Sequence, residues 1–515
     1  MPNNQAHDTR TTVAEDRVAA AVSLSVAAVV SGGGKGSLPE SYQLPAANFV
    51  AAKRPLKILQ PHQTLTSSES VYSWAEPGVT YELPISAVFG AYPYFFEIVD
   101  GPVSMTVGEF FVLGGDGVTL IRPTNYGVVS FDVPASGMDS FTYTVRITDQ
   151  EGNSESVVVN VTVSANKFLH LDASAADGGA GTAVSPLNKF SDVWKNDTDD
   201  ATYAGKILRI HAGNYVLYGD PGNSGNVNFD GSKKPKIWIN QPGETPVFDC
   251  SQAKILYNGG NMDDSAFIGI KYENARSDVS NSHFFWTTTS AQRGLFWRNK
   301  FKSLGKGQAG NDNPACIFIP AEATSSYVVK DNEGDTIAGP IYDTYNLTDS
   351  LLEGNRAINS TSNETHFIKG TATFCCVRHE EAVSGITGTF GLSLMMANTA
   401  GTSHDNEFCY NRIVMQNTSV GEALKVAWSS TAVSHYSQWC YRNTLVGRAR
   451  QLNADSSEWA YEKNIYTNDF PIGSALTLSD NVIVSVNDID ADGVLTGQPA
   501  ITYAGTHGAD ISGVG

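Results

Sequence analysis

The sequence is short of positive charge and of cysteine, and each shortage excludes a class of function. Among 515 residues, 34 are Lys or Arg and 53 are Asp or Glu, which gives a formal net charge of -19. Such a chain repels a phosphate backbone and has no basic cluster to offset the repulsion, so no nucleic-acid partner is expected. The six cysteines show no metal-ligand spacing, and we expect them to be reduced and buried, with no metal site.

Long hydrophobic runs are also missing. The apolar stretch 18–30 is too short to span a bilayer and is interrupted by serines. Asp8, Glu15 and Asp16 precede it, whereas a signal peptide has a basic flank. We therefore expect a retained N-terminus and no membrane partner. Because the chain also lacks a phosphate-binding loop, a dinucleotide fingerprint and a nucleophile elbow, no cofactor is expected.

Glycine and aromatic residues, in contrast, are plentiful, with 48 Gly, 23 Phe and 21 Tyr. This composition is typical of a folded, turn-rich chain of β-strands. We predict an all-β fold in three parts: an extended N-terminal arm over 1–77, a β-sandwich over 78–165 and a long region over 166–515. Nothing in the arm can close a core, so we expect it to dock on a partner or to be a loose tail.

Short alternating strands divided by Gly, Pro and Asp turns indicate the sandwich, at 95–99, 118–121, 140–147 and 157–163. The stretches 94–102 and 141–153 resemble the Ig/cadherin-like modules of bacterial and phage surface proteins. That resemblance implies a spacer or adhesive unit without chemistry of its own.

The opening of the C-terminal region carries a second resemblance. Residues 168–174, the glycines that follow them, and residues 205–215 resemble the start of the pectate-lyase-like β-helix families, in which a strand and a capping helix lead into the first coil. Residues 234–239 and 243–249 continue the resemblance into the next coil. It implies a right-handed parallel β-helix over 166–515.

A repeated asparagine supports the same fold independently. Short apolar strands run into a turn that contains Asn274, Asn299, Asn355, Asn411, Asn443, Asn464 or Asn481. The intervals fit one coil of roughly 20 to 30 residues, or two coils where one lacks the asparagine. Stacked asparagines can hydrogen-bond along a solenoid and tolerate a tight turn. Ordinary turn asparagines of an unrelated β fold are the alternative.

Three tetrads, 407–410, 438–441 and 458–461, share one pattern of polar and aromatic residues. Strand alternation places the aromatic residues of each tetrad on one face and the Glu or Gln with Cys or Ala on the other. Burying two unpaired carboxylates would be costly, so we predict an outward polar column. The prediction assigns these side chains to the interior: Phe408, Trp439, Trp459, Tyr410, Tyr441 and Tyr461.

The outward column contains Glu407, Gln438 and Glu458. If the coils are consecutive, Glu407 and Glu458 lie two rungs apart, about 9.6 Å, which is near the upper carboxylate separation of inverting glycosidases. One acid could then protonate a leaving group while the other activates water. A solvated polar column without chemistry is the alternative.

Lys369 and Arg378 form a second candidate site. His379, Glu380 and Glu381 lie beside them in the sequence, and His404 and Asp405 follow about one coil later. Polysaccharide lyases of this fold use a basic residue to remove a proton beside a uronate carboxylate, and cations to stabilise the resulting charge. The spacing of Lys369 and Arg378 matches no lyase motif known to us, and a surface ion-pair loop is the alternative.

An arm, an Ig-like module and a β-helix in this order resemble a phage tailspike or tail fibre. The resemblance implies a virion protein, assembled in the host cytoplasm, that contacts other virion proteins through its arm and binds a bacterial surface glycan through its β-helix. Tailspike β-helices are commonly trimers, which favours a homotrimer here. The alternatives are a non-enzymatic structural or decoration protein of the particle and a secreted, extracellular polysaccharide lyase or adhesin.

Overall fold

The computed structural model describes most residues between 38 and 504. Residues 1–37 and 505–515 are outside the description, as are several internal segments; the longer ones are 63–69, 114–119, 194–201, 218–225, 276–282, 306–313, 396–401, 416–421, 427–433, 452–458, 467–475 and 484–501. Almost all regular structure in the described part is β-strand. No helix within it has the length and apolar character that crossing a membrane requires.

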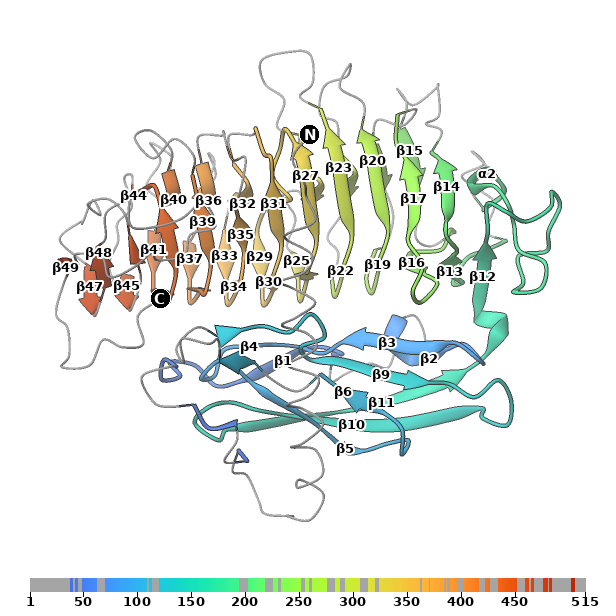
Figure 1. Cartoon of the computed structure of the whole chain (residues 1–515), viewed down its shortest axis with the longest axis horizontal. Helices are drawn as coiled ribbons and strands as arrows, with labels where there is room; N and C mark the ends of the chain where they lie inside the picture. The colour runs from blue at the N-terminus through green and yellow to red at the C-terminus, as the bar shows by residue number, and fades with distance from the viewer. Residues whose placement is uncertain are drawn as a thin grey trace, which may run out of the picture.

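From Phe168 onward the chain winds into a parallel β-helix (Figure 1). Each coil adds one strand to each of the long sheets, and equivalent residues of successive coils stack in register, as in Phe267, Phe296 and Val329. The solenoid predicted from the sequence is therefore confirmed.

We name the four sheets of the β-helix A to D. Sheet A contains β12 (Phe168–Leu171), β13 (Ile207–Ile210), β16 (Ile237–Asn240), β19 (Ala266–Ile268), β22 (Leu295–Trp297), β26 (Val328–Lys330), β30 (Leu351–Glu353), β34 (Cys376–Arg378), β38 (Glu407–Cys409), β42 (Gln438–Tyr441), β45 (Trp459–Glu462) and β47 (Leu476–Ser479). Sheet B contains β14 (Gly213–Val216), β17 (Pro246–Asp249), β20 (Lys271–Ala275), β23 (Lys300–Leu304), β27 (Glu333–Ile337), β31 (Arg356–Ile358), β35 (Glu381–Ala382), β39 (Arg412–Val414), β43 (Thr444–Val446), β46 (Ile465–Tyr466), β48 (Asn481–Ile483) and β49 (Thr502–Ala504).

Sheets C and D complete the coils. Sheet C contains β15 (Asn226–Phe229), β18 (Ile255–Asn258), β21 (Phe285–Thr287), β24 (Ile317–Ile319), β28 (Tyr342–Thr344), β32 (His366–Lys369), β36 (Phe390–Met395), β40 (Glu422–Val426) and β44 (Arg448–Gln451). Sheet D contains β25 (Thr324–Ser325), β29 (Leu347–Thr348), β33 (Ala372–Thr373), β37 (Thr402–His404) and β41 (Ser434–Tyr436).

The interior of the solenoid is a continuous apolar core. Aromatic rings of successive coils stack in it, with ring centroids 5.8 Å apart for Phe248 and Tyr272 and 5.6 Å apart for Tyr272 and Phe301. The short helix α2 (Phe190–Val193) closes the N-terminal end, where Phe190 packs on Trp238. All six cysteines are free and buried, as predicted.

A buried polar ladder runs along the turns between sheets A and B. Its rungs are Asn299, Asn332, Asn355, Glu380, Asn411 and Asn443, each bonded to the next. The asparagine column is thus confirmed for four of the predicted residues, while Asn332 and Glu380 were missed. Asn274 is exposed and takes no part in the ladder, and Asn464 lies outside the described residues.

The preceding region folds into two sheets that face one another. One holds β2 (Trp74–Ala75), β11 (Ser154–Val163), β10 (Ser140–Thr148) and β5 (Phe95–Asp100); the other holds β3 (Thr80–Pro84), β9 (Val128–Asp132) and β6 (Thr106–Val107). Their strands pair antiparallel except for β2, which runs parallel to β11. Smaller pairs are β1 (Lys57–Gln60) with β4 (Ser86–Val88), and β7 (Val112–Leu113) with β8 (Leu120–Ile121). Short 3-10 turns, η4 (Val71–Ser73) and η5 (Ala165–Lys167), lie at its borders. The Ig-like family of this sandwich stays a prediction.

The sandwich does not stand apart from the β-helix but lies along sheet A (Figure 1). One apolar cluster joins its residues, such as Val88 and Tyr94, to outward side chains of sheet A, such as Leu295 and Leu351. The described end of the arm also docks here, where Gln60 donates to the backbone oxygen of Gly294. The outer face of sheet A is therefore an internal interface of this chain.

Candidate functional site

The predicted exposure of Glu407 is wrong. Glu407 points out of the solenoid, but only 1% of it is exposed, because the arm covers it. Its Oε1 lies 3.9 Å from Nη1 of Arg54, and Tyr441 donates to its Oε2. Burial raises the pKa of Glu407 to about 7, although Arg54 and Arg378 act against this rise.

The predicted alignment of the polar column is also wrong, because the strands pair one residue away from the predicted register. Glu407 pairs with Trp439 rather than with Gln438, and Trp459 pairs with Gln438. Because side chains alternate along a strand, this one-residue shift exchanges the two faces. Phe408 lies in the interior as predicted, whereas Trp439 and Tyr441 lie outside, against the arm and sandwich.

In that position Trp439 makes a cation–π contact with Lys53, whose Nζ lies 3.7 Å from the ring centroid. Tyr410 also lies outside, stacked on His379. Glu458 falls outside the described residues, so its pairing with Glu407 stays a prediction.

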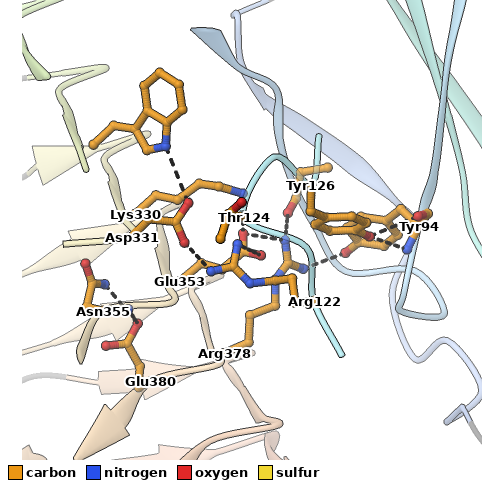
Figure 2. Close-up of polar contacts among 12 residues, drawn as sticks. Tyr94, Arg122, Thr124, Tyr126, Lys330, Asp331, Glu353, Asn355, Arg378 and Glu380 are labelled. Carbon is orange, nitrogen blue, oxygen red and sulfur yellow. Dashed lines mark hydrogen bonds and ion pairs between the residues drawn. The ribbon is translucent and has the colours of Figure 1, made fainter. Parts of the chain in front are cut away.

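Arg378 is likewise a buried interface residue and not part of a surface site. It donates to the Tyr94 hydroxyl and, with Lys330 and Arg122, surrounds the Glu353 carboxylate (Figure 2). Burial alone would raise the pKa of Glu353, but these three cations hold it well below its ordinary value. The cluster joins the sandwich to sheet A, because Arg122 of the sandwich side also pairs with Asp331, beside sheet A.

Lys369 and Arg378 are not brought together in one strand or sheet. Lys369 ends β32 in sheet C, where its backbone pairs with Met395, whereas Arg378 lies in sheet A. Glu380 is inside the solenoid as a rung of the ladder, with burial raising its pKa. The predicted lyase-type cluster is therefore not assembled, and the catalytic roles of its members stay predictions.

The outer face of sheet B is charged and self-compensated. Arg356 pairs with Glu333 and Glu381, and Arg412 also pairs with Glu381. Half-exposed pairs of this kind contribute little free energy and are common on solvated surfaces. Glu381 thus belongs to a surface ion-pair network, which was the alternative expected for that segment.

The outer face of sheet C is different, because it carries aromatic rings that remain partly exposed. Trp286 pairs in register with Phe318, and both point away from the core that holds Phe285 and Ile317. Their ring centroids lie 5.3 Å apart, and Tyr345 stands 5.9 Å from Phe318. We call Trp286, Phe318 and Tyr345 the aromatic face.

Two buried residues support the aromatic face from within. The His283 ring stacks on Phe318 at 4.6 Å, and its Nδ1 accepts a hydrogen bond from the Ala315 backbone. Asp343 follows Phe318 in the same column, so a carboxylate continues the line of rings. Stacking on His283 therefore holds the Phe318 ring in place, while the Asp343 carboxylate is buried beside the face and is not part of its exposed surface.

The aromatic face was missed because its sequence signal is short. Trp286 and Phe318 sit in three-residue strands, Phe285–Thr287 and Ile317–Ile319, in which apolar neighbours obscure the alternation. Aligning the third strand of each coil would have placed them in one column, but coil lengths vary and no asparagine marks that turn. Within the described residues, no three His, Cys, Asp or Glu side chains gather in a way that could hold a metal ion.

Comparisons with known proteins support no family assignment. No family model matches the chain, and no curated protein matches it. Among solved structures it is similar to a rhamnogalacturonan lyase (12% identity, TM-score 0.38, covering 61% of this chain and 87% of that one). It is similar to the pectate lyase Pel9A, with 14% identity and a TM-score of 0.39 over 65% of this chain and 88% of that one. It is also similar to Dex49A from Penicillium minioluteum, with 10% identity and a TM-score of 0.21 over 80% of this chain and 77% of that one. At these scores the likenesses carry no argument about activity.

Proposed function

We propose that this protein binds a polysaccharide along the outer face of sheet C, through Trp286, Phe318 and Tyr345. The observation that carries the proposal is the partly exposed aromatic cluster itself. The C–H face of a sugar ring is apolar and packs on an aromatic ring, while its hydroxyls bond to nearby polar groups. Rings gathered on the outside of a solenoid are not needed for its core and indicate a binding surface.

The arrangement of the face suits a chain ligand better than a single small molecule. Trp286 and Phe318 belong to adjacent rungs, which are about 4.8 Å apart along the solenoid axis. A glycan lying along that axis would contact successive rungs in turn. The other two long outer faces offer no such surface in the described part, because the sandwich covers sheet A and paired charges occupy sheet B.

The proposal is for binding, without cleavage. Of the four residues predicted to do chemistry, Glu407 and Arg378 lie under the arm and the sandwich on another sheet. A polysaccharide on sheet C would not reach Glu407 or Arg378 in this arrangement. Glu458 lies outside the described residues, and Lys369, at the end of β32 in sheet C, has no described acid or base partner from that prediction beside it.

Affinity electrophoresis against a panel of bacterial surface polysaccharides tests the proposal. Trp286→Ala combined with Phe318→Ala is expected to weaken binding roughly tenfold or more, because each lost ring contact is worth about 1 kcal/mol. Phe374→Ala is the matched control, since Phe374 is an exposed aromatic (37%) that contacts His404 elsewhere on the solenoid. Equal weakening by both variants, or no binding to any glycan, would contradict the proposal.

The phage setting is part of the proposal and rests on the order of arm, sandwich and β-helix. In that setting the glycan belongs to the host surface, and the arm holds the chain on the particle. The described end of the arm contacts this chain itself, so any virion partner would bind the residues that precede it. Detection of the chain in purified particles by mass spectrometry would support this setting, and its absence there would favour the secreted alternative.

A further inference from the structure

A cavity of about 140 Å³ lies between the sandwich and the first coils of the β-helix. Sandwich residues Trp74, Glu76 and Glu82 line one side, and Arg209, Asn240 and Trp297 of sheet A line the other. In Figure 1 this is the region where β2 and β3 run beside β13 and β16. A cavity of about 150 Å³ accommodates a six-membered ring such as benzene, so the space fits one ring of a ligand.

The floor of the cavity contains a donor that the protein does not use. The Arg209 side chain is only 7% exposed; its Nε donates to Glu76 and its Nη1 to the Asn240 backbone oxygen. Within the described residues, Nη2 of Arg209 has no hydrogen-bond partner. Nη2 is not itself fully buried, so it is accessible from the cavity and can donate to water or to a ligand acceptor.

The position of Arg209 is fixed by its neighbours. Glu76 accepts from Arg209 through Oε2, and its Oε1 lies 2.6 Å from Nε2 of His170. The guanidinium also lies over the Phe168 ring, 5.0 Å from its centroid. The donor is therefore held in place before any ligand arrives, which lowers the ordering cost of binding.

The walls and mouth of the cavity are aromatic and polar. The Arg298 guanidinium covers the Trp297 ring at 4.3 Å and pairs with Glu82, and both members of this ion pair are about one-third exposed. Trp74 and Tyr81 complete the aromatic lining. The two carboxylates and two guanidiniums of the lining balance in charge, so the site favours a neutral ligand over an anion.

We infer that this cavity binds a single neutral sugar ring, such as a terminal residue of a glycan. A pyranose has the size of the cavity, hydroxyl oxygens that can accept from Arg209, and an apolar face for the aromatic lining. The inference does not rest on the function proposed for the aromatic face, which lies on another sheet.

The test uses the full chain and a panel of neutral methyl glycosides, with binding measured by saturation-transfer NMR and by titration calorimetry. At least one glycoside is expected to bind saturably, with a Kd on the order of 1 mM. Thr80→Phe, which fills the mouth from β3, should abolish this binding. Thr142→Phe is the matched control. Both threonines lie on sandwich strands, and each donates one side-chain hydrogen bond, Thr80 to Asp132 and Thr142 to Asn160.

Two further variants separate the possible outcomes. Arg209→Lys keeps the charge but removes Nη2, and it should weaken binding at least tenfold in a chain that melts as a folded protein. Trp286→Ala should leave glycoside binding unchanged. If this variant no longer bound the glycoside, the ligand would be assigned to the aromatic face and the inference would be overturned. Binding of phosphate in place of glycosides, no saturable binding, or binding that Thr80→Phe leaves unchanged would also overturn it.

Discussion

At the residue scale, Glu407 shows how a carboxylate can be outward-facing and still buried. Its strand position directs it out of the solenoid, but the arm residue Arg54 and the sheet residue Tyr441 enclose it. The sequence could not reveal this, because the covering segment lies more than 300 residues away, as the Arg54–Asp405 contact shows. Tertiary docking, and not local pattern, decides its environment.

The raised pKa of Glu407 predicts a pH-dependent stability. Its folded pKa of about 7 exceeds the ordinary 4.5, so the folded state holds the proton more tightly than the unfolded state. Stability from this group is complete below pH 4.5, falls as the pH rises to 7 and is constant above that, with a total loss of about 3 kcal/mol.

The Glu407→Gln variant measures this effect. It should match the parent protein at pH 4 and be more stable at pH 8, as followed by thermal unfolding across that range. Glu155→Gln, at an exposed position on β11, is the control and should change stability little at either pH. A parallel pH profile for the parent and Glu407→Gln would mean that Glu407 is not held protonated.

At the element scale, the polar ladder fixes the turn between sheets A and B in successive coils. Asn355 donates to the Val329 oxygen and to Glu380, and it accepts from the Asn332 side chain. Glu380 can occupy an asparagine position because its Oε1 accepts from Asn355 as an amide oxygen would, and burial raises its pKa, which favours the uncharged carboxyl. Nearby His366 is neutral for the same reason, with burial lowering its pKa to about 3.

Removing one rung should therefore be costly. Asn355→Ala leaves several buried groups without partners, and we expect it to lower the free energy of unfolding by about 3 kcal/mol in urea-induced unfolding. Asn160→Ala, at an exposed position on β11, should change it by about 0.5 kcal/mol or less. Equal effects of the two substitutions would show that the ladder does not stabilise the coils.

The coils could be predicted because Asn299, Asn355, Asn411 and Asn443 recur after apolar strands. Asn332 follows the same kind of strand but was missed. The column is also hard to recognise at Glu380, which has a carboxyl group where the other rungs have an amide. The register of β38 against β42 was misjudged because Phe408 and Trp439 are both aromatic, and matching them by type misaligns the strands by one residue.

At the scale of the whole molecule, docking of the sandwich decides which surfaces remain open. Sheet A strands such as Ile207–Ile210 are buried on both faces. Their nearly continuous apolar sequence indicates burial of this kind. The partner on their outer face could not be read from that signal. A homotrimer stays a prediction, and in this arrangement it would have to form without the covered face of sheet A.

Hydrogen–deuterium exchange of the full chain, with and without a polysaccharide that it binds, tests most directly whether the aromatic face is the binding site. If the aromatic face binds the polysaccharide, exchange will be slower over β21, β24 and β28, where that face lies, and unchanged over β38 and β42. Protection over β38 and β42 with none over β21 and β24 would contradict this prediction and would return the site to Glu407.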